Sequence, residues 1–424
     1  MSLRWRERLA LLSGLGLWGY TIAHYVHGAF GYRGYGDFFL LMKTVREWLA
    51  TGHFVSQYVY LYPPLFYLIS APLAFLSDPI AVQVMVAINQ VLLVICMALL
   101  MVAIAPKSTW RLWGWMLLPL ALNFRPLLLL LSMAKIELLQ LTVLLGALVA
   151  FQRKRPWVTG LLVAVAGLIK PLPLLWVLYF AWKREWRVVR AWGVAVAALL
   201  ALSSFAVGVE AVWIYFSNVV LPRGENVMYW YEDQSLMGVV VRLFHPVQAN
   251  AFYIPSDQVS VWSLALGWGV RLVVCGWLAV LLGRRHEPSP SRVWGEWSVV
   301  SAGMLLLSPF SRDYYAVFLL PGYLLLATTL WNQRVGLKSK GFWLGLASYL
   351  LVGQGFPLGI IRKLPPLIPG VDNFHSYLHY GIPTLGYLLL IAAWAVVLGA
   401  EKSAGRAERH GAESVMAREV ALAP

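Results

Sequence analysis

Asp37 is the first residue of this chain whose type and position could support chemistry. It begins the segment "DFFLLMKTVREWLA", in which apolar residues recur every three to four positions, shortly after the first long apolar run. A carboxylate in the first turn of a helix is stabilised by the helix dipole and often acts only as a cap. At a membrane–water boundary the same carboxylate could accept a proton from a hydroxyl group. Asp37 is therefore a candidate helix cap, a candidate general base, or both.

Three cations stand in otherwise apolar or aromatic surroundings. Lys170 and Pro171 interrupt the apolar stretch 157–182, which predicts a turn at the outer surface because a lysine in mid-membrane is costly. That lysine either snorkels to the interface or faces a lipid phosphate. Arg242 and Arg312 are further candidates for binding a phosphate, and their plain alternatives are a solvated surface helix and a boundary ion pair.

Polar and aromatic side chains near these cations are candidates for binding a sugar or an acceptor. Tyr60 and Tyr62 belong to "YVYLYPP", whose alternation places the rings on one face of an extended segment. They could form a stacking wall, or only an interfacial aromatic belt. Asp233, Gln234 and Asp313 carry the oxygen and amide groups that hydrogen-bond sugars.

Two further groups of ionisable residues have weaker interpretations. "KIELLQ" places Lys135 and Glu137 at the start of an apolar segment, where ionisable groups are functional candidates, although a local Lys–Glu pair is an equally good explanation. "HSYLH" contains His375 and His379 at a spacing that could bind a metal, but no third ligand stands at a known spacing. We therefore predict no metal site.

Composition predicts an all-α polytopic membrane protein. Of 424 residues, 60% are hydrophobic and only 12% are charged, which no water-soluble domain could bury. Open sheets are excluded from lipid because their backbone groups would lack hydrogen bonds. We predict one transmembrane domain over residues 1–400 and a disordered cytoplasmic tail over 401–424. The expected spans, about twelve, are 9–28, 79–104, 111–122, 136–152, 157–169, 171–182, 188–207, 260–283, 293–307, 313–331, 341–354 and 381–399.

The charge distribution orients these spans. The net charge is +15, and most of the 34 lysines and arginines fall in the short loops on the same side as the N-terminus. Cytoplasmic loops carry such an excess, so both termini are expected inside the cell. The basic residues then face anionic lipid rather than nucleic acid. The two cysteines lie within expected spans, so we predict no disulfide.

The long loops all face outward in this topology. They cover about 29–78, 208–259 and 355–380, and loops on a rigid scaffold commonly carry the functional site. The first loop should contain an amphipathic helix from Asp37 to Ala50, ended by Gly52, which lies along the membrane surface. A second helix is expected after Pro63-Pro64.

Four segments together resemble glycosyltransferase family 87, a group of polyprenol-phosphate-mannose-type enzymes in the GT-C superfamily. The first is "GDFFLLMKTVREWLATGHFVSQYVYLYPPL", with its acid, glycine and Tyr–x–Tyr-Pro-Pro ending. The others are "GLLVAVAGLIKPLP", "DQSLMGVVVRLF" and "SPFSRDYY". Two segments depart from the family pattern, because "AKIELLQ" replaces a Gly-Gln-x-Asn start and Arg312-Asp313-Tyr314 replaces a Trp and His region. These departures could alter the sugar or the acceptor.

The resemblance implies a GT-C fold and an inverting transfer at the outer face of a bacterial cytoplasmic membrane. Asp37 would be the general base, and the donor would be a polyprenyl-phosphate sugar, with mannose expected. The acceptor would be lipid-linked or a glycan, and neither a cofactor nor a metal is expected. A multi-span solute or lipid transporter and an inactive membrane scaffold remain as alternatives. Retained transfer by an Asp37→Asn variant would remove Asp37 as the base.

Overall fold

The protein is represented by a computed structural model. It describes residues 5, 8–9, 12–20, 23–24, 36–52, 62–104, 117–220, 226–244, 253–283, 290–333, 337, 339–353 and 373–400. The predictions for Tyr60, most of the loop 355–380 and the tail 401–424 lie outside these residues. For Gly36 and Asp37 the structure gives the backbone only.

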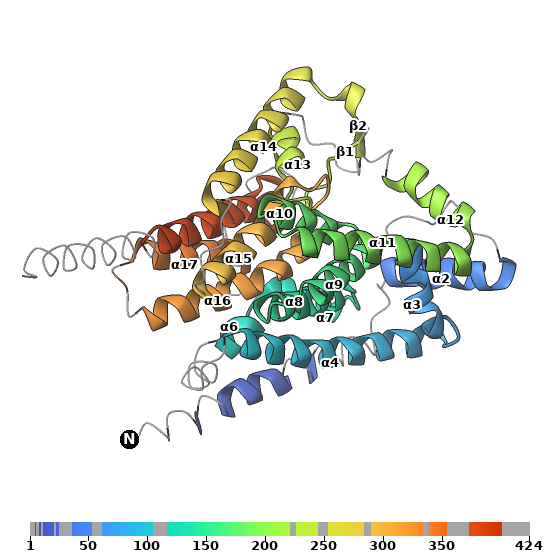
Figure 1. The fold of residues 1–424 in the computed structure, drawn as a ribbon, viewed down its shortest axis with the longest axis horizontal. Coiled ribbons are helices and arrows are strands. Elements are labelled where there is room, and N and C mark those ends of the chain that lie inside the picture. The colour runs from blue at the N-terminus through green and yellow to red at the C-terminus, as the bar shows by residue number, and fades with distance from the viewer. Residues whose placement is uncertain are drawn as a thin grey trace, which may run out of the picture.

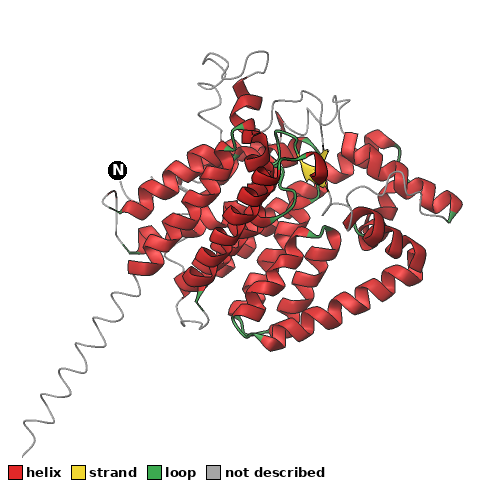
Figure 2. Cartoon of the chain, turned by 90° about the horizontal axis from the view of Figure 1, so that it is seen from above, coloured by secondary structure: helices red, strands yellow, loops and turns green. Residues whose placement is uncertain are grey.

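Helices make up nearly all of the described chain (Figure 2). In chain order they are α2 (Gly36–Thr51), α3 (Pro64–Ala74), α4 (Asp78–Ile104), α6 (Leu118–Leu122), α7 (Arg125–Ser132), α8 (Glu137–Gln152), α9 (Pro156–Ile169), η4 (Leu172–Leu175), α10 (Trp176–Trp182), α11 (Trp186–Val207), α12 (Val209–Ile214), the π-helix η5 (Tyr215–Val220), α13 (Leu236–Phe244), η7 (Ser256–Gln258), α14 (Val261–Leu282), α15 (Pro290–Leu307), η8 (Asp313–Leu319), α16 (Leu320–Asn332), α17 (Lys340–Gly353) and α19 (Asn373–His379). A last helix follows over Ile382–Ala400.

Helices coincide with most of the predicted spans, but fewer of them are long enough to cross a membrane. Five described helices qualify by length and composition: Asp78–Ile104, Trp186–Val207, Val261–Leu282, Asp313–Asn332 and Ile382–Ala400. The apolar segments around Lys170 are shorter, at Pro156–Ile169 and Leu172–Trp182. The helical membrane character is thus confirmed, while the number of spans stays a prediction.

The two helices expected in the first outer loop are present. α2 runs from Gly36 to Thr51 and ends at Gly52, whose φ of +70° suits a glycine and whose amide donates to the Trp48 carbonyl at 2.8 Å. α3 begins at Pro64, directly after Pro63, as proline in the first helical turn predicts. Both helices were predicted correctly from local signals alone.

Helices α2, α3 and α12 gather at one end of the molecule, as Figure 1 shows on its right-hand side. There α3 packs against α2, α9 and α11, and α12 continues from the end of α11. The contacts among α4, α8, α9 and α11 form one side of the bundle, and those between α15 and α16 lie on the other. A continuous apolar core joins the two sides.

Besides its helices, the described chain contains a small two-stranded sheet and an isolated β-bridge between Asp233 and Arg312. Strands β1 (Asn226–Met228) and β2 (Tyr253–Pro255) pair antiparallel, with Val227 opposite Ile254. Their apolar residues pack with α13. The sheet therefore anchors α13, which Figure 1 shows beside α14.

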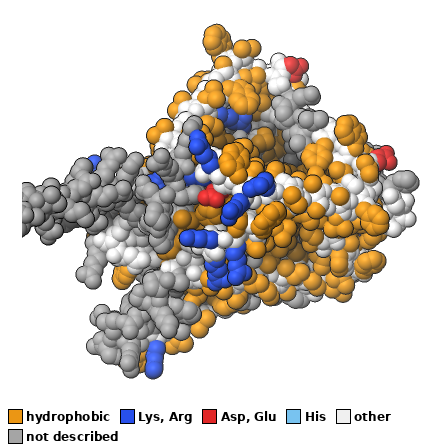
Figure 3. Space-filling model, viewed as in Figure 1, with side chains coloured by type: hydrophobic (Ala, Val, Ile, Leu, Met, Phe, Trp, Pro, Cys, Tyr) orange, Lys and Arg blue, Asp and Glu red, His pale blue; other side chains and the backbone are white. Residues whose placement is uncertain are grey.

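The surface of the molecule agrees with a membrane environment. Figure 3 shows one face that is mostly hydrophobic, with lysine and arginine side chains gathered over its left half. Large apolar side chains such as Phe205, Trp213 and Trp262 are strongly exposed, which suits contact with lipid.

Candidate functional site

Asp37 lies in the first turn of α2, and the helix itself is firmly fixed. Its apolar stripe, which includes Phe38, Met42 and Val45, is buried against α3 and α4. Arg46 holds the junction between α3 and α4: it donates to the Ala74 carbonyl at 3.0 Å, the Leu76 carbonyl at 2.8 Å and an Asp78 carboxylate oxygen at 2.6 Å. These contacts set the position of the backbone that carries Asp37.

Lys170 occupies the break between α9 and η4 that the Lys-Pro sequence predicts. Its side chain is buried rather than snorkelling, and Nζ lies 2.6 Å from Oε1 of Glu137 at the start of α8. The ammonium group also lies over two rings, 4.4 Å from the Tyr315 centroid and 5.3 Å from that of Tyr62. Gln140 fixes the turn by donating to the carbonyl of Lys170 at 2.9 Å.

Lys135 reaches the neighbouring ring from the turn between α7 and α8. Its Nζ lies 4.9 Å from the centroid of Tyr314. Ala134 adopts a left-handed conformation there, with φ of 49°, which costs free energy in a residue with a Cβ atom. The buried Asn89 stabilises the turn by donating to the Lys135 carbonyl at 3.0 Å.

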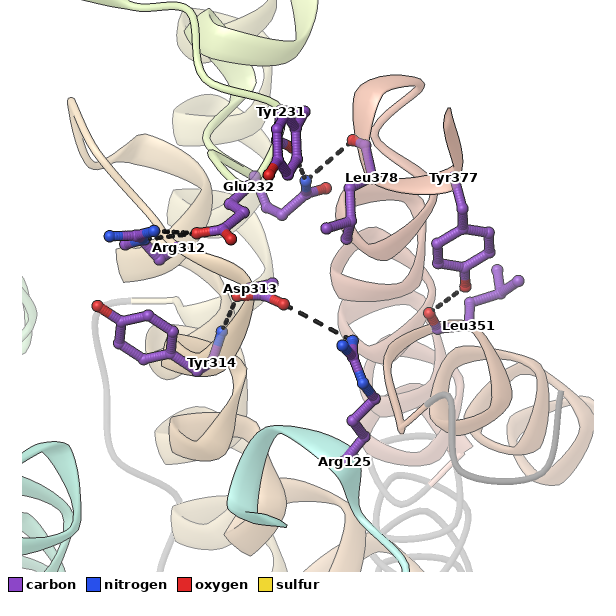
Figure 4. Close-up of polar contacts among 10 residues, drawn as sticks. Arg125, Tyr231, Glu232, Arg312, Asp313, Tyr314, Leu351, Tyr377 and Leu378 are labelled. Carbon is purple, nitrogen blue, oxygen red and sulfur yellow. Dashed lines mark hydrogen bonds and ion pairs between the residues drawn. The ribbon is translucent and has the colours of Figure 1, made fainter. Parts of the chain in front are cut away.

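Arg312 and Asp313 diverge from the start of η8 (Figure 4). Arg312 forms a salt bridge with Glu232 and lies 5.5 Å from the Tyr314 ring centroid. Asp313 accepts a hydrogen bond from the Tyr314 amide at 2.8 Å, and its other oxygen lies 3.7 Å from Arg125. The sequence suggests an ion pair at the end of a span. In the structure Arg312 pairs with Glu232, and Asp313 pairs separately with Arg125.

Asp233 and Gln234 build the junction behind these pairs. Asp233 Oδ1 accepts from the Ser311 amide at 2.6 Å, and Oδ2 accepts from the Ser235 hydroxyl at 2.7 Å. Burial raises the pKa of the Asp233 carboxyl, although Arg242 and these hydrogen bonds act in the opposite direction. Gly238 is needed because a Cβ atom there would lie 1.9 Å from Asp233 Oδ2.

Gln234 and Arg242 use their donors within the fold. The Gln234 amide group donates to the carbonyls of Tyr231 and Leu378, both at 3.0 Å. Arg242 is buried on α13 and donates to the carbonyls of Trp230, Asp233 and His379. These contacts give both residues a positioning role, and they add no support to the prediction that Gln234 binds a sugar or that Arg242 binds a phosphate.

The adjacent rings of Tyr314 and Tyr315 connect these groups. Their centroids are 5.0 Å apart, and the cations Lys135, Lys170 and Arg312 lie over one or the other. The structure thus gathers Tyr62, Lys170, Arg312 and Asp313 from the predicted set around one aromatic pair. Arg125 was not identified from the sequence, because no local signal marks a cation that pairs with a carboxylate on η8.

Neither histidine of "HSYLH" takes part in a metal cluster among the described residues, where no three His, Cys, Asp or Glu side chains are grouped to hold an ion. The His375 ring packs 4.3 Å from that of Tyr231, and the His379 carbonyl accepts from Arg242. Burial and the charge of Arg242 lower the pKa of His379. The histidines therefore contribute to packing around α19.

Comparison with known proteins identifies the family. The family described as glycosyltransferase family 87 matches residues 60–309, more than half of the chain. That range contains Lys170, Asp233 and Arg242, whereas Asp37 precedes it and Arg312 follows it.

Two similar relatives are polyprenol-phosphate-mannose-dependent α-(1-2)-phosphatidylinositol mannoside mannosyltransferases. The one from Mycobacterium tuberculosis is 26% identical over 302 residues, which cover 64% of this chain and 63% of the relative. The one from Mycolicibacterium smegmatis is 24% identical over 304 residues, which cover 64% and 62%. The matched part spans less than two thirds of each relative, and on the family match the chain belongs to glycosyltransferase family 87.

Proposed function

We propose that this protein is a membrane glycosyltransferase that moves a sugar, with mannose expected, from a polyprenyl-phosphate donor to a lipid-linked or glycan acceptor. The observation that carries the proposal is the gathering of Lys135, Lys170 and Arg312 around the Tyr314–Tyr315 pair, in a chain of this family. Cations at the end of a helical bundle suit a phosphate whose prenyl chain remains in the bilayer.

The chemistry is a single displacement at the outer face of the membrane. Asp37 takes the proton of the acceptor hydroxyl as its oxygen attacks the anomeric carbon of the donor sugar. The bond between that carbon and the phosphate oxygen breaks, and the polyprenyl phosphate leaves with the negative charge. Lys170 and Arg312 stabilise the charge that develops on this leaving group, and the configuration of the sugar inverts. Tyr62 and Asp313 contribute to binding the sugar or the acceptor.

The arrangement of the cations supports this assignment in a second way. Lys170 and Arg312 each carry a carboxylate partner, Glu137 and Glu232, which keeps the buried charges compensated before the donor binds. A phosphate that enters the group meets preorganised donors rather than free, hydrated side chains. Preorganised charge is what makes electrostatic stabilisation of a leaving group effective.

The direct test is transfer by the purified full-length protein in nanodiscs. Radiolabelled polyprenyl-phosphate mannose is supplied with a lipid-extract acceptor pool and, separately, with phosphatidylinositol mannoside, the acceptor in the relatives' names. We expect radiolabelled mannose in a glycolipid product, and an Asp37→Asn variant of normal yield should lose at least about a hundredfold of this rate because it lacks the base.

Three outcomes would contradict all or part of the proposal. Lack of transfer from any polyprenyl-phosphate sugar to any acceptor in the pool would argue against a glycosyltransferase. Unchanged transfer by the Asp37→Asn variant would remove Asp37 as the base while leaving the activity in place. Uptake of a solute against its gradient in vesicles would favour the transporter alternative instead.

A further inference from the structure

Glu137 is a buried acid with only part of its hydrogen-bonding capacity used. It stands at the first position of α8 with no exposed surface. Oε1 lies 2.6 Å from Lys170 Nζ, whereas Oε2 accepts no hydrogen bond from the described residues. A buried carboxylate oxygen without a donor is costly, so this position is suited to a hydrogen-bond donor from a bound molecule.

Gln140, one turn further along α8, also has a buried oxygen that accepts no hydrogen bond from the described residues. Its amide nitrogen donates to the carbonyls of Ala166 at 2.8 Å and Lys170 at 2.9 Å, and its buried Oε1 accepts no hydrogen bond from the described chain. The two acceptor oxygens therefore belong to side chains that both engage the turn at Lys170. Their geometry is fixed by that turn rather than by flexible contacts.

A second buried Lys–Glu pair in the molecule gives the comparison. Lys183 Nζ lies 2.6 Å from Oε1 of Glu296, and both side chains are fully buried. There Arg292 also donates to Oε1 at 2.7 Å, and the Tyr179 hydroxyl donates to Oε2 at 2.9 Å. Both carboxylate oxygens of Glu296 therefore accept hydrogen bonds. Of the two buried Lys–Glu pairs, only the one with Glu137 leaves a carboxylate oxygen without a donor among the described residues.

We propose that Glu137 is a specificity-determining residue that recognises the sugar of the lipid-linked donor. Its Oε1 holds Lys170 at the phosphate, Oε2 accepts a hydrogen bond from a sugar hydroxyl, and Gln140 Oε1 accepts a second one. This inference rests on the proposed function, in which Lys170 contacts the phosphate. The sugar is bonded directly to that phosphate, so its nearest hydroxyls lie within reach of a carboxylate that touches Lys170.

The surrounding rings fit the same ligand. Tyr62 and Tyr315 lie over the Lys170 ammonium group. Their rings also pack against those of Phe66 and Tyr314, with centroids 4.8 and 5.0 Å apart. Tyr62 lies two residues before α3, which begins at Pro64. A sugar offers hydroxyl donors to the two acceptors and an apolar ring face to the tyrosines, which a bare phosphate does not.

The test measures donor preference in the Glu137→Gln variant of the full-length protein. The donors are polyprenyl phosphates of mannose, glucose and galactose: glucose differs from mannose only at C2 and from galactose only at C4. Replacing the acceptor oxygen with an amide should lower kcat/KM for the preferred donor about 10- to 100-fold, as expected for a hydrogen bond to an ionised group. For donors whose sugar does not make this hydrogen bond, kcat/KM should fall less. The ratio of kcat/KM between the preferred donor and the others should therefore decrease.

Glu296→Gln is the matched control, because it changes the same residue type in a buried Lys–Glu pair away from the proposed site. It should lower thermal stability without altering the ratio between donors. Glu137→Asp provides a second variant that keeps the charge beside Lys170 but withdraws the carboxylate by one methylene group, and it should also narrow the preference.

Three results would overturn the inference. Equal losses for every donor in Glu137→Gln and Glu137→Asp would make Glu137 only a counter-ion for Lys170. An equal change in donor preference in Glu296→Gln would make the effect a general consequence of instability. Absence of transfer by the wild-type protein from any donor would remove the proposed function and this inference with it, a result distinct from the first two.

Discussion

At the residue scale, the ion pair between Lys170 and Glu137 is costly to bury, and both residues are proposed to contact the donor. Both groups are buried, so each loses hydration that only the partner and nearby dipoles replace. Removing one member leaves an uncompensated charge, whereas replacing both with apolar side chains of similar size need not destabilise the fold. Stability and activity can therefore be separated by comparing single and double variants.

We predict that Lys170→Met lowers the free energy of unfolding by about 3–5 kcal/mol, because Glu137 remains buried without its cation. The double variant Lys170→Met/Glu137→Leu should recover most of that stability but no transferase activity, since the phosphate contact is absent in both. Thermal unfolding in detergent and the radiolabel transfer assay measure the two quantities. Recovery of activity in the double variant would show that Lys170 serves only the fold.

The sequence identified one member of most charged pairs but not its partner. Lys170, Arg312 and Asp313 stand out locally, because charges are rare in apolar segments. Glu137 was noted, yet a local pair with Lys135 was as good an explanation as any other, since the contact with Lys170 bridges 33 residues of sequence. Asp233 and Gln234 were predicted to bind a sugar from their oxygen and amide groups alone, and that stays a prediction. The sequence does not reveal that the Ser311 amide donates to Asp233 or that Gln234 donates to the Leu378 carbonyl.

At the element scale, α2 is positioned by its contacts with the α3–α4 junction. The three contacts of Arg46 differ in kind: two are hydrogen bonds to carbonyls near the end of α3, and one is an ion pair with a half-exposed Asp78. Exposed ion pairs contribute little, so the carbonyl contacts should dominate. α2 carries the proposed base, and small displacements of reacting groups are costly in rate.

We expect Arg46→Ala to lower transfer about 10- to 100-fold with only a modest loss of stability, because it loosens α2 and thereby Asp37. Asp78→Asn, which removes only the exposed ion pair, should retain most activity. Lys43→Ala is the matched control on the same helix, since its pair with Glu47 is 3.8 Å long and its side chain is 54% exposed. Equal losses in all three variants would indicate a nonspecific effect of surface charge.

Element boundaries could be predicted well where the signals are local. Apolar length, Gly52 and the Pro63-Pro64 and Lys170-Pro171 pairs place the helix ends within a few residues of those observed. The interior position of α13 could not be predicted, because its burial depends on the β1–β2 pairing and on hydrogen bonds from Arg242, one of which reaches the His379 carbonyl 137 residues away. Tertiary contacts of this kind leave no periodic pattern in the chain.

At the scale of the whole molecule, two buried charge clusters occupy different places in the fold. Lys183, Arg292 and Glu296 join α10 with the end of α14 and the start of α15. Lys183 and Arg292 both donate to the Leu282 carbonyl, and Glu296 accepts from both of these cations. The cations around Tyr314 and Tyr315 lie instead where α8, α9 and η8 begin or end. The first cluster has a structural role, and the second is the proposed site.

The orientation of these clusters across the membrane yields the last prediction. We expect Asp257 in η7 to face the outside and Arg153 in the loop after α8 to face the cytoplasm, because the basic loops define the inner side. Both positions are exposed. Asp257→Cys and Arg153→Cys are each introduced after replacement of Cys96 by Ala and Cys275 by Ser, the two native cysteines. A membrane-impermeant maleimide should label Asp257→Cys in intact cells, and Arg153→Cys only after permeabilisation. The reverse pattern would place Asp37 and the proposed donor site on the cytoplasmic side, where the acceptor would have to be found instead.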